Sequence, residues 1–130
     1  MRIYFGSTAD ELQVFLQELT LDLPDAYAPT PIFSSTHPEM DQEEIEYSLS
    51  LLAAEDALEL VEEKSGHALV IACEVPLEIL GDFDEISATL NKALHWSQVE
   101  AIFIIGDDIE DLTWYAPQEA AASIEEWLKG

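Results

Sequence analysis

The stretch Asp41–Glu63 is the longest regular element that the sequence predicts, and it constrains the fold more than any other feature. At about 100° of rotation per residue in an α-helix, its apolar residues gather on one arc of roughly 200°. They are Tyr47, Leu49, Leu51, Ala53, Ala54, Ala57, Leu58, Leu60 and Val61. Carboxylates occupy most of the other side, namely Glu44, Glu55, Asp56, Glu59, Glu62 and Glu63. One face should therefore be buried against a sheet, while the other faces water.

The segments before this helix alternate between strand and helix patterns. Arg2–Gly6 predicts a short strand, and Thr8 with Glu11 forms a capping-box pattern that opens a helix to about residue 19. Tyr27–Phe33 is expected to be an edge strand or an irregular strap, because its two prolines cannot donate ladder hydrogen bonds. The long helix has its own capping pair, Asp41 and Glu44, and a conventional stop at Lys64 and Gly66.

Two apolar runs after the long helix predict central strands, Ala68–Val75 and Ala101–Gly106. Between them, Ile86–Leu90 alternates like a half-buried strand, and Ser97–Glu100 suits one helical turn. Pro117 fits the start of a final helix. The order predicts a mixed α/β (α+β) fold with one mixed sheet of four or five strands and helices mainly on one face. Residues 1–130 should form a single compact domain.

The charge of the chain restricts its partners. The sequence holds 28 acidic residues against four basic ones, a formal net charge of −24, and the acids are spread along the chain. Such a surface disfavours direct binding to nucleic acid or to an anionic membrane and favours basic partners or cations. The alternative explanation of this charge is that it keeps the protein soluble and has no further role.

The setting is expected to be the cytoplasm. Cys73 is the one cysteine, which excludes an internal disulfide, and its apolar neighbours predict a buried thiol. The first residues lack a signal-peptide pattern, and no apolar segment approaches the ~18 residues that span a bilayer.

Four segments resemble one family when they are taken in order. MRIYFGST at the start, EEIEYSLSLLAAEDAL in the long helix, LVIACEVP and LTWYAPQE are similar to motifs of small, acidic, uncharacterised actinobacterial proteins with a domain of unknown function. Similar proteins carry a longer segment between the acidic pair ending at Asp108 and the Trp-Tyr motif, where this chain has only Ile109–Thr113. The resemblance implies a fold and a bacterial cytoplasmic setting, and no activity.

Several residues are candidates for chemistry, and none predicts a cofactor or a metal site. The acids of Asp107–Asp111 do not follow the calcium-loop spacing, so a solvated loop is favoured. His37, His67 and His95 lack zinc spacing. Glu74 ends a central strand, where open sheets place ligand sites, although a solvent-facing role is the default.

The segment Leu112–Glu119 is the remaining candidate. Trp114, Tyr115, Gln118 and Glu119 could line a small-molecule pocket or an interface, or they could seal the end of the sheet with Glu119 as a helix cap. The sealing role is favoured.

The leading functional hypothesis is a non-enzymatic protein that acts on a basic protein partner through its acidic surface, with nucleic-acid mimicry as a sharper form. The interaction residues would be Glu55, Glu59 and Glu62 on the long helix. The alternative is a small enzyme or ligand-binding domain with a pocket at Trp114, Tyr115 and Glu119. No membrane contact and no direct nucleic-acid binding are expected.

Overall fold

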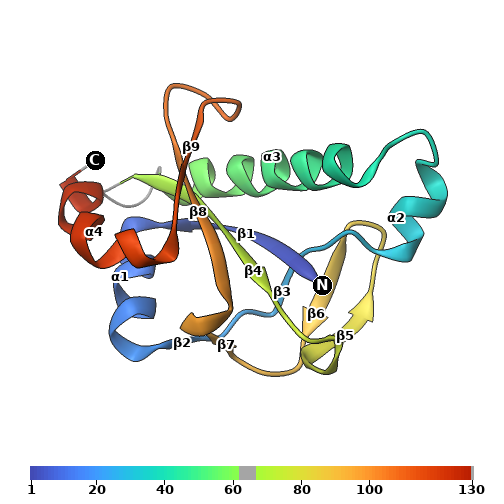
Figure 1. Cartoon of the computed structure of the whole chain (residues 1–130), viewed down its shortest axis with the longest axis horizontal. Coiled ribbons are helices and arrows are strands. Elements are labelled where there is room, and N and C mark those ends of the chain that lie inside the picture. Colours follow the sequence, from blue (N-terminus) through green and yellow to red (C-terminus); the bar gives the residue numbers. More distant parts are fainter. Residues whose placement is uncertain (62–66, 130) are drawn as a thin grey trace.

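An antiparallel sheet forms the centre of the molecule (Figure 1). The structure is a computed structural model that describes residues 1–61 and 67–129. Within that part of the chain, the sheet has seven strands in the order β5-β6-β3-β1-β4-β8-β9, and all of its pairings are antiparallel. Its longest pairing joins β1 (Arg2–Thr8) to β4 (Ala68–Glu74) along the whole length of both strands.

The other strands of this sheet are shorter, apart from β8. They are β3 (Asp25–Tyr27), β5 (Leu80–Phe83), β6 (Ser87–Leu90), β8 (Val99–Ile105) and β9 (Leu112–Tyr115). A separate pair joins β2 (Thr20–Leu21) to β7 (Leu94–His95). The α-helices are α1 (Ala9–Glu18), α2 (Pro31–Thr36), α3 (Gln42–Val61) and α4 (Ala120–Lys129). Single 3₁₀ turns occur at Leu77–Ile79, Trp96–Gln98 and Pro117–Glu119.

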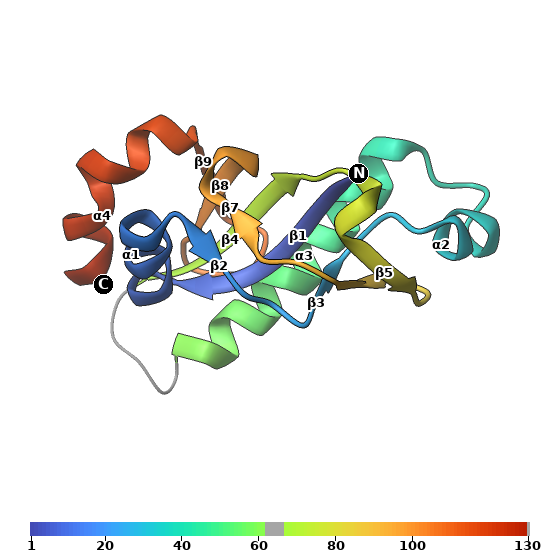
Figure 2. The same ribbon diagram turned by 90° about the horizontal axis from the view of Figure 1, so that it is seen from below.

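Helices cover both faces of the sheet, as Figures 1 and 2 show. Side chains alternate along β1, so that Ile3 and Phe5 point to one face and Tyr4 to the other. The first core packs Ile3 and Phe5 with residues of α1 and α4, including Phe15 and Trp127. The second core packs Tyr4 with residues of α3. The continuous apolar run of β4 follows from this burial on both faces.

The chain is mixed α+β, but the predicted sheet is wrong in three respects. It has seven strands instead of four or five, its pairings are antiparallel instead of mixed, and its helices are not confined mainly to one face. The two extra strands, β5 and β9, are edge strands of four residues each, whose apolar patterns are too brief to identify from sequence.

The strand expected at Tyr27–Phe33 is shifted and largely absent. Its strand part is β3, which ends at Tyr27 and lies inside the sheet between β1 and β6. Pro31 begins the short helix α2, whose N-cap Thr30 accepts a hydrogen bond from the Phe33 amide at 3.2 Å. Proline is favoured at that first position because the residue needs no intrahelical donor there.

The predicted caps of the longer helices are present. Thr8 Oγ1 accepts the Glu11 amide at 3.2 Å, although the Glu11 carboxylate accepts from Ser7 Oγ at 2.9 Å instead of reaching back to Thr8. Asp41 and Glu44 exchange both bonds of a capping box, at 2.8 and 3.3 Å. The predicted stop of α3 at Lys64 and Gly66 lies outside the described residues.

The buried face of α3 is rotated from the predicted arc. Ile45, Leu49, Ser50, Ala53, Ala54 and Ala57 are the residues that it buries. Tyr47 and Leu60, which the pattern placed on that face, are 51% and 40% exposed. The helix is apolar around more than half of its circumference. Its sequence therefore shows that one side is buried, but not which residues lie at the middle of that side.

Small residues let α3 approach the sheet closely at Gly6 of β1. A Cβ atom at Gly6 would lie 2.7 Å from the backbone nitrogen of Ala57 and would also clash with the carbonyl oxygen of Ala53. Ala53 and Ala57 are themselves completely buried. The glycine is therefore required by the close approach of two backbones.

Candidate binding cleft

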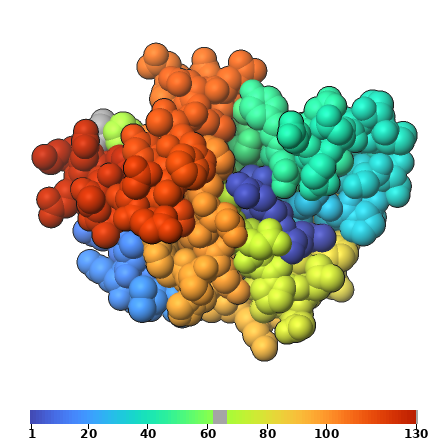
Figure 3. Space-filling model, viewed as in Figure 1, coloured from blue at the N-terminus to red at the C-terminus, as the bar shows by residue number. Residues whose placement is uncertain are grey.

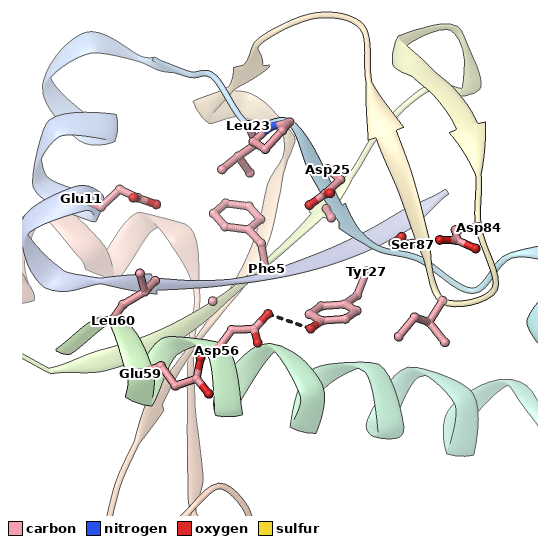
Figure 4. Close-up of a pocket in the computed structure, with 14 residues that line it drawn as sticks. Phe5, Glu11, Leu23, Asp25, Tyr27, Asp56, Glu59, Leu60, Asp84 and Ser87 are labelled. Atoms are coloured by element: carbon pink, nitrogen blue, oxygen red, sulfur yellow. Dashed lines mark hydrogen bonds between the residues drawn. The ribbon is translucent and has the colours of Figure 1, made fainter. Parts of the chain in front are cut away.

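An open cleft of about 790 Å³ lies beside the C-terminal half of α3 (Figure 4). We call it the acidic cleft. Its lining residues are Phe5, Gly6, Glu11, Leu23, Pro24, Asp25, Ala26, Tyr27, Asp56, Glu59, Leu60, Asp84, Ile86 and Ser87. They come from α1, β1, the segment around β3, α3 and the turn that leads into β6.

The strand order brings these distant segments together. Strands β6, β3 and β1 are neighbours in the sheet. Asp25 of β3 and Asp84, which precedes β6, therefore line the same cleft as β1, although they are distant from it in the sequence. Helix α3 crosses the sheet over β1 and supplies Asp56 and Glu59 as the facing wall. Phe5 and Ile86 contribute apolar surface.

The described lining of the cleft carries negative charge. Among residues 1–61 and 67–129, it includes five carboxylates, those of Glu11, Asp25, Asp56, Glu59 and Asp84, and no lysine, arginine or histidine. A concave surface lined by one sign of charge concentrates its field and attracts ions of the opposite sign. The geometry therefore suits a cationic ligand whose apolar portion contacts the floor.

Tyr27 links the two walls of the cleft. Its hydroxyl donates to Asp56 Oδ2 at 2.7 Å, which joins β3 to α3. Burial, the hydrogen bond to Asp56 and the charge of that carboxylate all raise the pKa of Tyr27. The phenol therefore stays protonated at neutral pH and acts as a hydrogen-bond donor, not as a base.

The predicted interaction residues on α3 do not all lie in the acidic cleft. Glu59 lines the acidic cleft, and Glu55 is exposed without lining it. Glu62 lies outside the described residues. Sequence reasoning did not find Glu11, Asp25, Asp56 and Asp84 as partners of Glu59, because the acids in this chain are too numerous to single out four without the strand order.

The Trp-Tyr segment does not form a shared cavity. Trp114 pairs with Phe103 of β8, whereas Tyr115 pairs with Ile102, so the two side chains point to opposite faces of the sheet. Tyr115 packs edge-on against Trp127 with ring centroids 5.0 Å apart, and Trp114 is 58% exposed. Glu119 Oε2 accepts the Ala116 amide at 2.7 Å, as expected for the capping role. Gln118 is exposed.

The acidic loop between β8 and β9 protrudes from the surface (Figure 3). Its carboxylates accept backbone bonds within the loop: Asp108 from the Glu110 amide at 2.9 Å, and Asp111 from the Asp107 amide at 3.2 Å. Within residues 1–61 and 67–129, no group of three or more histidine, cysteine or acidic side chains is placed to hold a metal ion.

The remaining polar candidates have structural surroundings. Cys73 is buried in the first core, and burial raises the pKa of its thiol to about 12. It is therefore a poor nucleophile at neutral pH. Glu74 is exposed and accepts from the N-terminal ammonium at 3.2 Å. The exposed His95 caps the Trp96–Gln98 turn through its Nδ1.

Fold and cleft together define a small α+β protein with an acid-lined cleft. The chain belongs to the DUF6912 family, a family of unknown function whose profile matches residues 1–111. The match includes every residue of the acidic cleft and ends before the Trp-Tyr segment. No curated protein and no solved structure matches the chain. Across residues 1–61 and 67–129, the helices are all too short or too polar to cross a membrane.

Proposed function

We propose that this protein is a non-enzymatic binding protein that receives a basic segment of a partner protein in the acidic cleft. The observation that carries the proposal is the cleft itself, whose lining in the described part of the chain holds five carboxylates and no basic side chain. The net charge of −24 supplies a long-range field that draws a basic partner towards it.

The distribution of the acids favours a chain segment over a single small cation. The five carboxylates come from α1, β3, α3 and the 84–87 turn, on different sides of the opening. One ammonium group would contact only one or two of them. A segment with several lysine or arginine residues could place a charge near each wall while its aliphatic stems cover Phe5 and Ile86.

The experiment compares two variants that each remove two charges. Glu59→Gln with Asp84→Asn changes the cleft, whereas Glu43→Gln with Glu125→Gln changes exposed residues of α3 and α4 that do not line it. Binding of a short oligolysine peptide is measured by calorimetry at low salt. We expect about threefold to tenfold weaker binding for the cleft variant, from two exposed ion pairs, and little change for the control.

Equal weakening in the two variants would contradict the proposal, because summed charge alone would then govern binding. A partner captured from cells should show the same ranking. Nucleic-acid mimicry is the narrower form of this function, and it requires that a captured partner be displaced by DNA or RNA. Displacement by oligolysine but not by nucleic acid would leave the basic-segment function in place and reject mimicry.

The setting that we propose is the bacterial cytoplasm, as for the actinobacterial proteins that the chain resembles. A single cysteine, buried and unpaired, fits a reducing compartment. Fractionation of the native cells with an antibody tests this location.

A further inference from the structure

A second cavity, of about 310 Å³, lies on the opposite flank of α3 from the acidic cleft. It adjoins the N-terminal half of the helix and strands β8 and β9, whereas the acidic cleft adjoins the C-terminal half and strands β3 and β6. We call it the aromatic cavity. Its lining residues are Tyr4, Glu46, Tyr47, Ser50, Phe103, Glu110 and Leu112.

Three aromatic residues from three elements line this cavity. Tyr4 comes from β1, Tyr47 from α3 and Phe103 from β8. Tyr4 is 3% exposed, and its hydroxyl accepts a hydrogen bond from Arg2 Nε at 3.0 Å, so its ring is fixed in place. Tyr47 is 51% exposed and stands at the rim. An exposed tyrosine beside a buried one leaves aromatic surface available to a ligand.

The charged side chains that line the aromatic cavity are acidic. Glu46 and Glu110 are the acids that line it, and no lysine, arginine or histidine of residues 1–61 and 67–129 does so. The pKa of the Tyr4 phenol is raised mainly by burial, and the nearby charge of Glu46 contributes to raising it. Arg2 contacts the ring of Tyr4, with its guanidinium carbon 5.7 Å from the centroid, so the rings left for a ligand are those of Tyr47 and Phe103.

This combination suits one kind of ligand group. A quaternary ammonium has no N–H to donate and is recognised by the faces of aromatic rings together with nearby negative charge. A divalent cation would need several converging oxygen ligands, and a neutral apolar ligand would not use the two carboxylates. We propose that the aromatic cavity binds a trimethylammonium group, held by the rings of Tyr47 and Phe103 and by the charges of Glu46 and Glu110, with the buried Tyr4 packed beneath them.

The test compares choline with its neutral isostere, in which a tert-butyl group replaces the trimethylammonium group. Each is titrated into the intact protein, and binding is followed by amide chemical shifts in two-dimensional NMR. We expect choline to shift amides around the cavity and to bind about five- to tenfold more tightly than the isostere. Equal binding of the two compounds, or no saturable shift with either, would overturn the proposal.

Variants separate the cavity from the surrounding surface. Tyr47→Leu and Glu46→Gln should each weaken choline binding about threefold or more. Phe83→Leu is the control, because Phe83 of β5 is also an exposed aromatic residue and does not line the cavity. Equal losses in Tyr47→Leu and Phe83→Leu would overturn the site, since any exposed ring would then suffice.

Two further arms identify the source of the ammonium and separate this site from the acidic cleft. Tighter binding of a trimethyl-lysine peptide than of choline places the group on a protein, and the reverse order places it on a small molecule. The cleft variant Glu59→Gln with Asp84→Asn should leave choline affinity unchanged within about twofold, because neither residue lines the aromatic cavity. A tenfold loss of choline affinity in that variant would show that choline binds in the acidic cleft, and would overturn the inference.

Discussion

Gly6 is the residue at which the distance between α3 and the sheet is decided. Backbone atoms of Ala53 and Ala57 occupy the space that a side chain at residue 6 would need. Backbone atoms within a helix cannot yield independently, so any larger residue must push the whole helix outwards. The walls of both cavities would move with it, since α3 contributes to each.

Gly6→Ala is therefore expected to destabilise the protein by about 1–3 kcal/mol, the usual cost of overpacking a core. Denaturant unfolding followed by circular dichroism measures it. Gly81→Ala is the comparison, because its Cβ would meet the side chains of Thr89 and Asn91, which can rotate away. A smaller loss for Gly6→Ala than for Gly81→Ala would contradict the close packing described.

Tyr27 gives the fold a sensitivity to alkaline pH. Its pKa in the folded protein is raised above the ordinary value of 10.0, so the unfolded chain loses this proton at lower pH than the folded chain. Stability from this group is fully present below about pH 10 and is lost as pH rises further towards the folded pKa. In thermal scans between neutral and alkaline pH, Tyr27→Phe should lose stability less steeply than the unmodified protein. Parallel curves would refute this linkage.

At the scale of elements, α3 stabilises the second core through a buried stripe centred on Leu49. Leu49 is completely buried, whereas Leu58 is only partly buried and Leu60 is 40% exposed. Leu49→Ala should therefore cost about 2–5 kcal/mol and Leu60→Ala much less, with Leu58→Ala between them. The midpoints of urea unfolding give the order. Equal effects at all three positions would mean that the helix has no fixed rotation.

Long and strongly patterned elements were the ones that could be predicted from the sequence. The apolar runs of β4 and β8, the long helix α3 and its capping pair Asp41 and Glu44 all have local causes. The strands β2, β5 and β7 could not be predicted, because two to four residues carry no readable period and their pairing depends on partners far along the chain.

The candidate sites show the same limit more sharply. Glu59 could be singled out because it lies on a visible helix face, but Asp25 and Asp84 join it only because β3 and β6 are neighbours in the sheet. Trp114 and Tyr115 are adjacent in sequence and for that reason point to opposite faces of a strand. The sequence did not identify Leu112–Tyr115 as a strand, so a pocket shared by the two rings stayed open as the alternative to the sealing role.

At the scale of the whole molecule, the acids far outnumber the cations that could neutralise them. Among the described residues, the ion pair between the N-terminus and Glu74 is the one that the structure shows, at 3.2 Å. Most of the charge is therefore balanced by counter-ions instead of by the protein, and like-charge repulsion opposes the compact state.

Added salt should accordingly stabilise the fold. Raising the ionic strength from very low to about 0.15 M shortens the screening length to about 8 Å and weakens repulsion between exposed carboxylates. The thermal midpoint is expected to rise over this range with sodium chloride. A constant or falling midpoint would show that the carboxylates are already arranged far enough apart to be harmless.

The position of α3 between the two cavities also determines whether their occupants influence one another. Tyr47 and Glu59 are separated by ~18 Å along the axis, from a rise of about 1.5 Å per residue. This distance exceeds the screening length at physiological salt, about 8 Å, but not that at 0.01 M, about 30 Å. Two cationic ligands should therefore bind independently in the first condition. In the second they should show negative cooperativity, equal in both directions by thermodynamic linkage.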